Sequence, residues 1–242
     1  MKWAVFSDIH GNLEAFTSVC DYISKENIDK IAILGDIVGY GANPKECIDQ
    51  LKDRADIIVV GNHDFAATGL TDISNFNSAA RTAIEWTIKQ LPDVGSAFLS
   101  DLPLTSIVDD LTFVHSSPHN PQEWKYLLSM NDVVNSFNFY YNRICFVGHS
   151  HIPAIYIKDS KGKVSSSKDL QVQLEDRAKY IINVGSVGQP RDGNPAAAFG
   201  ILDTEESVFT INRAPYDIRA AQKKIIEAGL PERLAIRLAV GK

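Results

Sequence analysis

The sequence predicts an α/β fold, with a parallel sheet in its first half and a second, partly antiparallel sheet in its second half. Three short apolar runs at 3–6, 31–34 and 57–60 alternate with helix-like segments at 13–25 and 44–54. This β-α-β-α-β order favours parallel strands, because each returning strand needs a crossover connection. Six further apolar runs, separated by turn residues, are typical of a second sheet. They span 111–114, 144–147, 154–157, 180–184, 198–202 and 208–211.

Apolar spacing predicts the helices. In the first helix, apolar residues recur three to four positions apart and therefore lie on one face. They are Leu13, Phe16, Cys20 and Ile23. Pro44 suits the first turn of the second helix. A third helix is predicted over 76–91, ending before Pro92, inside a helical excursion at about 66–100.

The chain shows no linker, repeat or low-complexity tract, so we expect a single domain over 1–242. The stretch 159–167 is rich in Lys, Gly and Ser and predicts an exposed hairpin loop. The tail at about 215–242 has a helical composition, interrupted at Gly229-Leu230-Pro231. It is predicted to pack on the domain or on a partner subunit, and a homo-oligomer is therefore one expectation.

Composition excludes several classes of protein. Of 242 residues, 45% are hydrophobic and 22% are charged, which is ordinary for a globular chain. The net charge of −6 predicts no basic surface for extended nucleic acid. The apolar runs fall short of the ~20 residues that span a membrane, and the first one ends too soon for a signal peptide. Together with three widely spaced cysteines, interpreted as buried free thiols, this favours the cytoplasm.

Polar residues follow each predicted strand of the first half. They occupy 7–12, 35–36 and 61–64, directly after the last apolar position of each run. In open parallel sheets, ligands bind beyond the carboxyl ends of the strands. Five of the six histidines also follow apolar runs, namely His10, His63, His115, His149 and His151. The sixth, His119, is interpreted as a loop residue.

Several of these residues are suited to binding metal. Asp8 and His10 are two positions apart, so an extended backbone would point both side chains to the same side. His149 and His151 repeat this spacing.

Three further residues complete a set of seven possible ligands. Asp36 can bridge two cations through its two carboxylate oxygens, Asn62 offers an amide oxygen, and His115 offers an imidazole nitrogen. Seven ligands are enough for two divalent ions. Carboxylate, amide and imidazole without thiolate suit manganese, iron or zinc and argue against a closed structural zinc site. Two such ions with two carboxylates leave a local charge of about +2, which favours an anion such as phosphate.

Together these segments resemble the calcineurin-like metallophosphoesterases, in the order found in that family, from residue 3 to about 203. The motifs are Asp8-Ile9-His10, Gly35-Asp36-Ile37-Val38-Gly39, Gly61-Asn62-His63-Asp64, His115 and Gly148-His149-Ser150-His151. The resemblance is to the small bacterial and archaeal phosphodiesterase-type members. It implies two mixed sheets packed as a sandwich, with helices on the outer faces and a dinuclear metal centre at the strand ends.

The resemblance also implies a role for each residue. One metal would take Asp8, His10, Asp36 and His151. The other would take Asp36, Asn62, His115 and His149. His63 would donate a proton to the leaving oxygen or stabilise charge on the phosphoryl group, with Asp64 orienting its ring. The alternative for Asp64 is a turn-capping carboxylate.

Besides Asn62, which could also contact phosphate, three more residues are candidates for contacting substrate. Tyr40, in Gly39-Tyr40-Gly41, could stack on a base or cover the sheet edge. Asn12 could contact phosphate, cap the first helix, or do both. Arg191 lies in a glycine-rich turn at 183–193 that resembles the matching loop of the subgroup. It could grip a phosphate oxygen, or pair with Asp192 at the surface.

The predicted activity is metal-dependent hydrolysis of a phosphodiester or phosphomonoester by a water or hydroxide activated between two ions. Manganese is the expected metal, with iron, zinc, nickel or magnesium as alternatives. The substrate is expected to be a small phosphorylated compound or nucleotide, because a helical cap over 76–91 would narrow access. Alternative functions are a dinucleoside polyphosphate hydrolase, a protein serine/threonine phosphatase, or a non-catalytic scaffold on the same fold.

Overall fold

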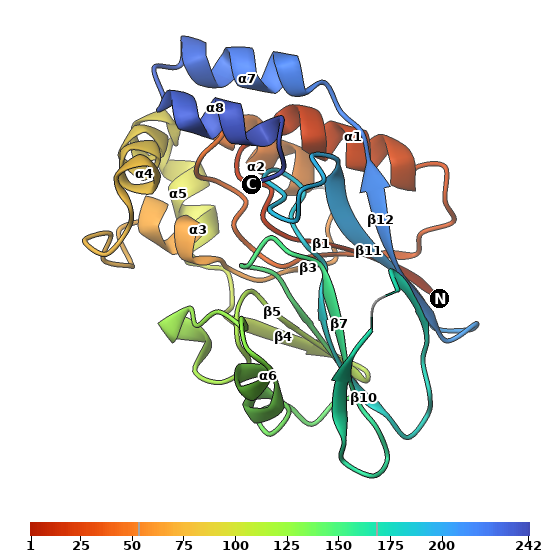
Figure 1. The fold of residues 1–242 in the computed structure, drawn as a ribbon. Coiled ribbons are helices and arrows are strands. Elements are labelled where there is room, and N and C mark those ends of the chain that lie inside the picture. The colour runs from red at the N-terminus through yellow and green to blue at the C-terminus, as the bar shows by residue number, and fades with distance from the viewer. Residues whose placement is uncertain (53, 168) are drawn as a thin grey trace.

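The computed structural model describes residues 1–52, 54–167 and 169–242. Two six-stranded mixed sheets pack face to face, and helices cover their outer faces (Figure 1). This arrangement confirms the predicted two-sheet sandwich.

The first sheet has the strand order β3-β2-β1-β11-β12-β9. Its strands are β1 (Lys2–Phe6), β2 (Lys30–Ile33), β3 (Ile57–Ile58), β9 (Gln171–Gln173), β11 (Ala197–Asp203) and β12 (Val208–Ala214). Strands β1, β2 and β3 are parallel, as the sequence predicts, and β11 runs antiparallel to β1. The carboxyl ends of β1 and β2 therefore meet at one edge.

The second sheet has the order β4-β5-β6-β10-β7-β8. Its strands are β4 (Thr105–Val108), β5 (Leu111–Val114), β6 (Ile144–Val147), β7 (Ala154–Lys158), β8 (Val164–Ser166) and β10 (Lys179–Asn183). The neighbouring strands β5, β6 and β10 pair in parallel, whereas β4, β7 and β8 each join their neighbours in antiparallel pairs. The segments that follow β5 and β6 consequently leave this sheet at the same edge, close to the carboxyl end of β1.

The core between the sheets follows from strand alternation. Trp3 and Val5 point into the space between the sheets, while Ala4 and Phe6 point outward to the helices. Phe113 and Phe146 fill the same space from the second sheet, where their rings stack at 5.6 Å.

The helices of the described residues pack in three groups. The α-helices are α1 (Leu13–Ile23), α2 (Pro44–Lys52), α3 (Asn62–Ala67), α4 (Ser78–Gln90), α5 (Asp93–Ser100), α6 (Met130–Ser136), α7 (Ile218–Glu227) and α8 (Glu232–Leu238). Helices α1 and α2, joined by α3 and α5 in the same core, cover the first sheet, and α6 covers the second. Helices α7 and α8 pack on each other and share a core with α4 and Tyr40, so the chain's tail lies against its own domain (Figure 1).

The structure adds elements that the sequence did not predict. Strand β4 carries alternating exposed residues, and β8 and β9 are three-residue edge strands, so none has a continuous apolar run. β8 occupies part of the predicted loop at 159–167. The predicted second helix extended to residue 54, but α2 ends at Lys52, and Asp53 lies outside the described residues.

All three cysteines are buried and free in the described chain, as predicted. Among the described helices, none is both long and apolar enough to span a membrane.

Candidate metal centre and active site

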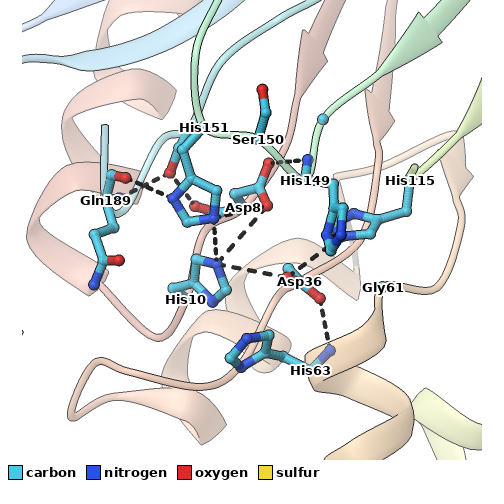
Figure 2. Close-up of polar contacts among 12 residues, drawn as sticks. Asp8, His10, Asp36, Gly61, His63, His115, His149, Ser150, His151 and Gln189 are labelled. Carbon is cyan, nitrogen blue, oxygen red and sulfur yellow. Dashed lines mark hydrogen bonds and ion pairs between the residues drawn. The ribbon is translucent and has the colours of Figure 1, made fainter. Parts of the chain in front are cut away.

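The loops that follow β1 and β2 run side by side. Asp8 N–H donates to Gly35 C=O at 3.0 Å, and His10 N–H donates to Asp36 C=O at 2.9 Å. These bonds continue the pairing of the two strands beyond their ends, so Asp8, His10 and Asp36 are fixed in one cluster (Figure 2).

Five of the ligand-type residues have a left-handed backbone. Their φ angles lie between 50° and 66°, at Asp8, His10, Asp36, His149 and His151. This conformation costs roughly 1–2 kcal/mol for a residue with a Cβ, and such strain concentrates at functional sites. The expected alternation of an extended strand is therefore wrong: the side chains converge because each loop turns sharply.

In Asp8 and Asp36, one carboxylate oxygen accepts a backbone hydrogen bond and the other faces the histidines. His149 N–H donates to Asp8 Oδ2 at 3.0 Å, and His63 N–H donates to Asp36 Oδ1 at 2.8 Å. Asp8 Oδ1 is buried and has no hydrogen-bond partner among the described residues. Asp36 is placed so closely against the α3 N-terminus that a Cβ at Gly61 would collide with its carboxylate.

Backbone carbonyls orient three of the histidines. The Nδ1 atom of His10 lies 3.1 Å from Val38 C=O, that of His115 lies 2.6 Å from Leu34 C=O, and that of His151 lies 2.6 Å from Gln189 C=O. A carbonyl oxygen only accepts hydrogen bonds, so each Nδ1 carries the proton. In the neutral rings, Nε2 is therefore the atom with a free lone pair.

These Nε2 atoms gather around the carboxylates in two clusters. Asp8 Oδ1 lies 3.2 Å from His151 Nε2 and 3.8 Å from His10 Nε2. Asp36 Oδ2 lies 3.5 Å from His10 Nε2 and 3.4 Å from His115 Nε2 (Figure 2). Asp36 is therefore shared between the two clusters.

The ring nitrogens fit metal ions. His10 Nε2 and His151 Nε2 face each other at 3.1 Å, although both carry lone pairs. Burial lowers the pKa of both rings, so neither takes up a second proton at neutral pH. A shared cation satisfies two lone pairs that point at each other. The groups able to hold metal include Asp8 with His10 and His151, and Asp36 with His115 and His149.

The second cluster has further unpartnered atoms. His149 turns Nδ1 to within 3.1 Å of His115 Nε2, and its own Nε2 is buried without a partner in the described chain. Asn62 Oδ1 is likewise buried and unpartnered there. None of the predicted ligands is more than 7% exposed. His149 thus belongs to the second cluster with Asp36 and His115, and Asn62 lines the same cavity as His149.

Burial and charge set the protonation of the metal-free site. Burial, followed by the nearby His115, lowers the pKa of His149 to about 3. Burial raises the pKa of Asp36, but His115, His63 and His10 outweigh it, and the net pKa lies well below the usual range. For His115, burial lowers the pKa, whereas Asp36 and other acceptors raise it to a net value of about 9.

His63 lies beside the metal ligands. Its ring is 4.8 Å from that of His10, 4.5 Å from that of Tyr40 and 5.2 Å from that of Phe76. Its Nδ1 is buried without a partner in the described structure, and it also forms a possible metal-holding group with His10 and Asp36. Burial is the main cause that lowers the pKa of His63 to about 4.

Asp64 does not orient the His63 ring, so that expectation is wrong. Its carboxylate accepts hydrogen bonds from the backbone N–H groups of Ile37, Val38 and Gly61 at 2.9 to 3.1 Å. It is the acidic residue of a capping box at the start of α3. Burial, followed by the charge of Asp36, raises the pKa of Asp64 to about 7. Asp64 therefore ties the loop after β2 to α3, which is the turn-capping alternative.

Asn12 is a structural residue. Its side-chain oxygen accepts from Ala15 N–H and caps α1, and its amide donates to Gly188 C=O and Tyr216 Oη. Because both ends of the amide are engaged and the residue is buried, the expected phosphate contact is not supported.

Tyr40 and Arg191 lie at the rim of the centre. The Tyr40 ring is buried 4.6 Å from that of His10. Arg191 lies 5.8 Å over the Tyr40 ring, and its backbone N–H donates to His151 C=O. The Arg191 guanidinium donates a hydrogen bond to Gln189 Oε1, while Asp192 forms an ion pair with Arg213. The alternative of an Arg191–Asp192 surface pair is therefore wrong.

A cavity of about 250 Å³ opens beside His63. Its lining includes Tyr40, Asn62, His63 and His149, together with Asn75, Phe76, Asn77, Ala80, Trp124 and Tyr126. The sequence reasoning missed Trp124, Tyr126 and the two asparagines. The signal that could have found the two aromatic residues is their occurrence as a pair inside the polar segment 120–126. His119 lies elsewhere, with its ring stacked on Phe139 at 3.8 Å.

A family model described as the calcineurin-like phosphoesterase superfamily domain matches residues 1–207. The chain belongs to the calcineurin-like phosphoesterases. The family predicted from the motifs is thereby confirmed. The family model ends before β12, so α7 and α8 lie outside it.

Relatives of this calcineurin-like phosphoesterase extend over its whole length. An uncharacterised protein of Methanocaldococcus jannaschii is 41% identical over 247 residues, covering 99% of this chain and 98% of that protein. The crystal structure of a metallophosphoesterase from Sphaerobacter thermophilus has a TM-score of 0.88 and 38% identity, with 100% of this chain and 99% of that chain covered. A hypothetical protein of Pyrococcus horikoshii has a TM-score of 0.78 at 21% identity, with 100% and 98% covered, and shows the same fold.

Proposed function

We propose that this protein hydrolyses a phosphate ester with two divalent metal ions that share Asp36. The observation that carries the proposal is the position of Asp36 Oδ2, 3.5 Å from His10 Nε2 and 3.4 Å from His115 Nε2. A carboxylate oxygen between imidazoles of two clusters is the arrangement that a bridging ligand requires.

The proposed ligand sets follow the two clusters. Asp8, His10, Asp36 and His151 would hold one ion. Asp36, Asn62, His115 and His149 would hold the other. Manganese is the proposed metal, because oxygen and imidazole donors without thiolate suit it. When bound, two such ions lower the pKa of a water molecule and stabilise charge on the phosphoryl group.

His63 is proposed to assist departure of the leaving group. Its ring lines the cavity next to the centre, so a bound ester would lie against it. With a pKa of about 4 the ring is neutral at neutral pH and can donate one hydrogen bond to a phosphoryl oxygen. The negative charge of a bound phosphate raises the ring's affinity for a proton, which His63 would then transfer to the leaving oxygen.

Arg191 is proposed to hold the substrate phosphate. Its Nε is buried without a hydrogen-bond partner among the described residues, and its backbone N–H donates to His151 C=O. An arginine fork can bind two phosphoryl oxygens at once. The same side chain lies over Tyr40, so a phosphate held by Arg191 would lie near the Tyr40 ring.

The shape of the site favours a small substrate over a folded phosphoprotein. Phe76 and Trp124 wall the cavity next to His63, and the histidines are buried. A phosphorylated side chain on a protein surface would need an open, shallow cleft. A dinucleoside polyphosphate remains compatible with this cavity and is the second candidate substrate.

Metal-stripped protein reconstituted with Mn²⁺ tests the proposal. Bis-p-nitrophenyl phosphate, p-nitrophenyl phosphate and diadenosine tetraphosphate are supplied side by side, with the metal-stripped protein as the control. We expect metal-dependent turnover of at least one ester, and the preferred compound distinguishes diesterase, monoesterase and polyphosphate hydrolase. Folded, metal-loaded protein that cleaves none of them would contradict the proposal and favour a non-catalytic scaffold.

A further inference from the structure

We infer that the cavity beside the metal centre binds the nucleobase of a nucleotide substrate. This inference rests on the proposed phosphoesterase function and specifies its substrate class. It is carried by the position of the cavity, by the aromatic and amide side chains that line it, and by two arginines at its edge that form no salt bridge among the described residues.

The cavity shares its inner wall with the metal centre. Asn62, His63 and His149 line it, and all three belong to the buried site described above. A group that occupies the cavity therefore lies directly beside the phosphoryl group that those residues would face. With a volume of about 250 Å³, the cavity accepts one ring system rather than a large polymer.

Aromatic rings form the other walls, and each contacts a histidine of the site. Phe76 lies 5.2 Å from His63. Tyr126 stacks on His149 at 3.9 Å with planes 22° apart, and it remains 46% exposed. Aromatic side chains bind nucleobases by stacking, whatever the base, because every base has a π face. These walls therefore favour a planar ring over an alkyl or sugar group.

Trp124 is held at the cavity by an unusual backbone. Its φ of 52° and ψ of 37° place a bulky residue in the left-handed region, where L side chains are strained. The ring contacts Phe65 at 5.8 Å and His115 at 6.0 Å, but Trp124 packs with none of the four hydrophobic cores of the described chain. Strain without a contribution to the core is typical of a residue placed for binding.

Two asparagines supply polar groups at the same opening. Asn77 Oδ1 caps α4 by accepting from Ala80 N–H, which leaves its NH₂ group to donate. Asn75 is exposed beside Phe76. Nucleobase edges carry both donors and acceptors, so amides next to stacking rings suit a base better than a purely apolar ring.

Arginines at the edge indicate an anionic ligand. Arg233 of α8 donates to Asn77 Oδ1, and Arg191 lies over Tyr40. Within residues 1–52, 54–167 and 169–242, neither of these two guanidinium groups forms a salt bridge with a carboxylate. A nucleotide brings the planar ring and the negative charge together.

Calorimetry of Mn²⁺-loaded protein with adenosine monophosphate and with ribose 5-phosphate tests the inference. The two ligands carry the same phosphate and sugar and differ only in the base. We expect adenosine monophosphate to bind about 5- to 150-fold more tightly, as stacking on aromatic side chains provides. Phosphate release is followed in the same samples.

Variants locate the binding of the base. Trp124→Ala and Phe76→Ala should bring the affinity for adenosine monophosphate toward that for ribose 5-phosphate, and Trp124→Phe should restore most of the preference. Tyr141→Ala is the matched control, because Tyr141 is 99% exposed and does not line the cavity. The control should keep the full preference.

The outcomes separate this inference from the proposed function. Equal affinity for the two ligands, or a preference that Trp124→Ala and Phe76→Ala both leave intact, would overturn the nucleobase site even if esters are hydrolysed. A preference lost in these variants supports the site, and it would do so even if the ester panel showed no hydrolysis, which would overturn the proposed function alone.

Discussion

The metal centre and the cavity beside it are built in different ways. The ligand-type residues of the centre are buried, follow the ends of strands, and are held by backbone hydrogen bonds such as His149 N–H to Asp8. The cavity takes Phe76, Trp124 and Tyr126 from connections between elements, and Tyr126 is half exposed. The proposed chemistry would thus reside on a frame held by backbone hydrogen bonds, whereas the proposed recognition of substrate would reside on loops that can vary without disturbing that frame.

The largest expected effect concerns the centre, at Asp36. Asp36→Asn removes the charge shared by both clusters while keeping the size of the side chain. We expect turnover of bis-p-nitrophenyl phosphate to fall at least about a thousandfold, equivalent to about 4 kcal/mol of transition-state stabilisation. Steady-state kinetics at saturating Mn²⁺ measures the effect.

Asp176→Asn is the matched control for this prediction. The Asp176 side chain is 96% exposed, far from any ligand-type residue in sequence, and its only ion pair among the described residues is a long one with Arg143. The control should keep its activity. Near-normal turnover of Asp36→Asn would show that the centre does not depend on a shared carboxylate.

His63 lies where the metal centre and the cavity meet. Removing its side chain should lower turnover, but by less than Asp36→Asn at the upper end of its effect. His63→Ala removes a ring that lines the cavity without removing any proposed ligand, so turnover should fall about 10²- to 10⁴-fold, as general acid groups contribute. Metal content, measured by elemental analysis, should be unchanged. Loss of an ion from this variant would instead make His63 a ligand, in the group that it forms with His10 and Asp36.

Asp64 should affect the rigidity of the centre more than its chemistry. Asp64→Ala leaves three buried backbone N–H groups without an acceptor, which should lower the free energy of unfolding by about 3 kcal/mol or more. Urea unfolding measures this change. Asp132→Ala removes the matching acid of an exposed capping box on α6 and should cost only about 1 kcal/mol. Equal losses in the two variants would contradict the role given to Asp64.

The smallest effect is a proton released on metal binding. In the metal-free protein His115, with a pKa of about 9, carries a second proton at pH 7, and a metal ligand must give it up. Below pH 9, metal affinity should therefore rise about tenfold per pH unit. Calorimetry in buffers of different ionisation enthalpy should detect about one proton released at pH 7 and almost none at pH 10. No release at pH 7 would contradict this protonation state.

The frame of the centre could be predicted from sequence because its signals are local. Apolar runs followed at once by Asp, Asn and His mark the strand ends, and parallel strands bring those ends to one edge. Residue types at these positions are sufficient to predict Asp8, Asp36 and His115 as ligands. The same logic predicted the core face of α1 and the N-cap at Asn12.

Other features depend on tertiary contacts and left no local signal. The left-handed backbone at Asp8 and His10 arises where their loop pairs with the loop after β2. Asp and His adopt this conformation more often than most residues, but that preference is too weak to predict it at a given position. The carboxylate of Asp64 reaches backbone N–H groups 26 and 27 positions away, so its neighbour His63 was a misleading guide. The cavity joins residues 75–77 and 124–126, which only the fold brings together.

The number of metal ions per chain tests the central claim most directly. Metal-stripped protein is titrated with Mn²⁺ and examined by native mass spectrometry, alongside Asp36→Asn. The account predicts two ions per wild-type chain and fewer than two in the variant. A single ion in the wild-type protein, or two ions retained by Asp36→Asn, would contradict a centre in which two metals share this carboxylate.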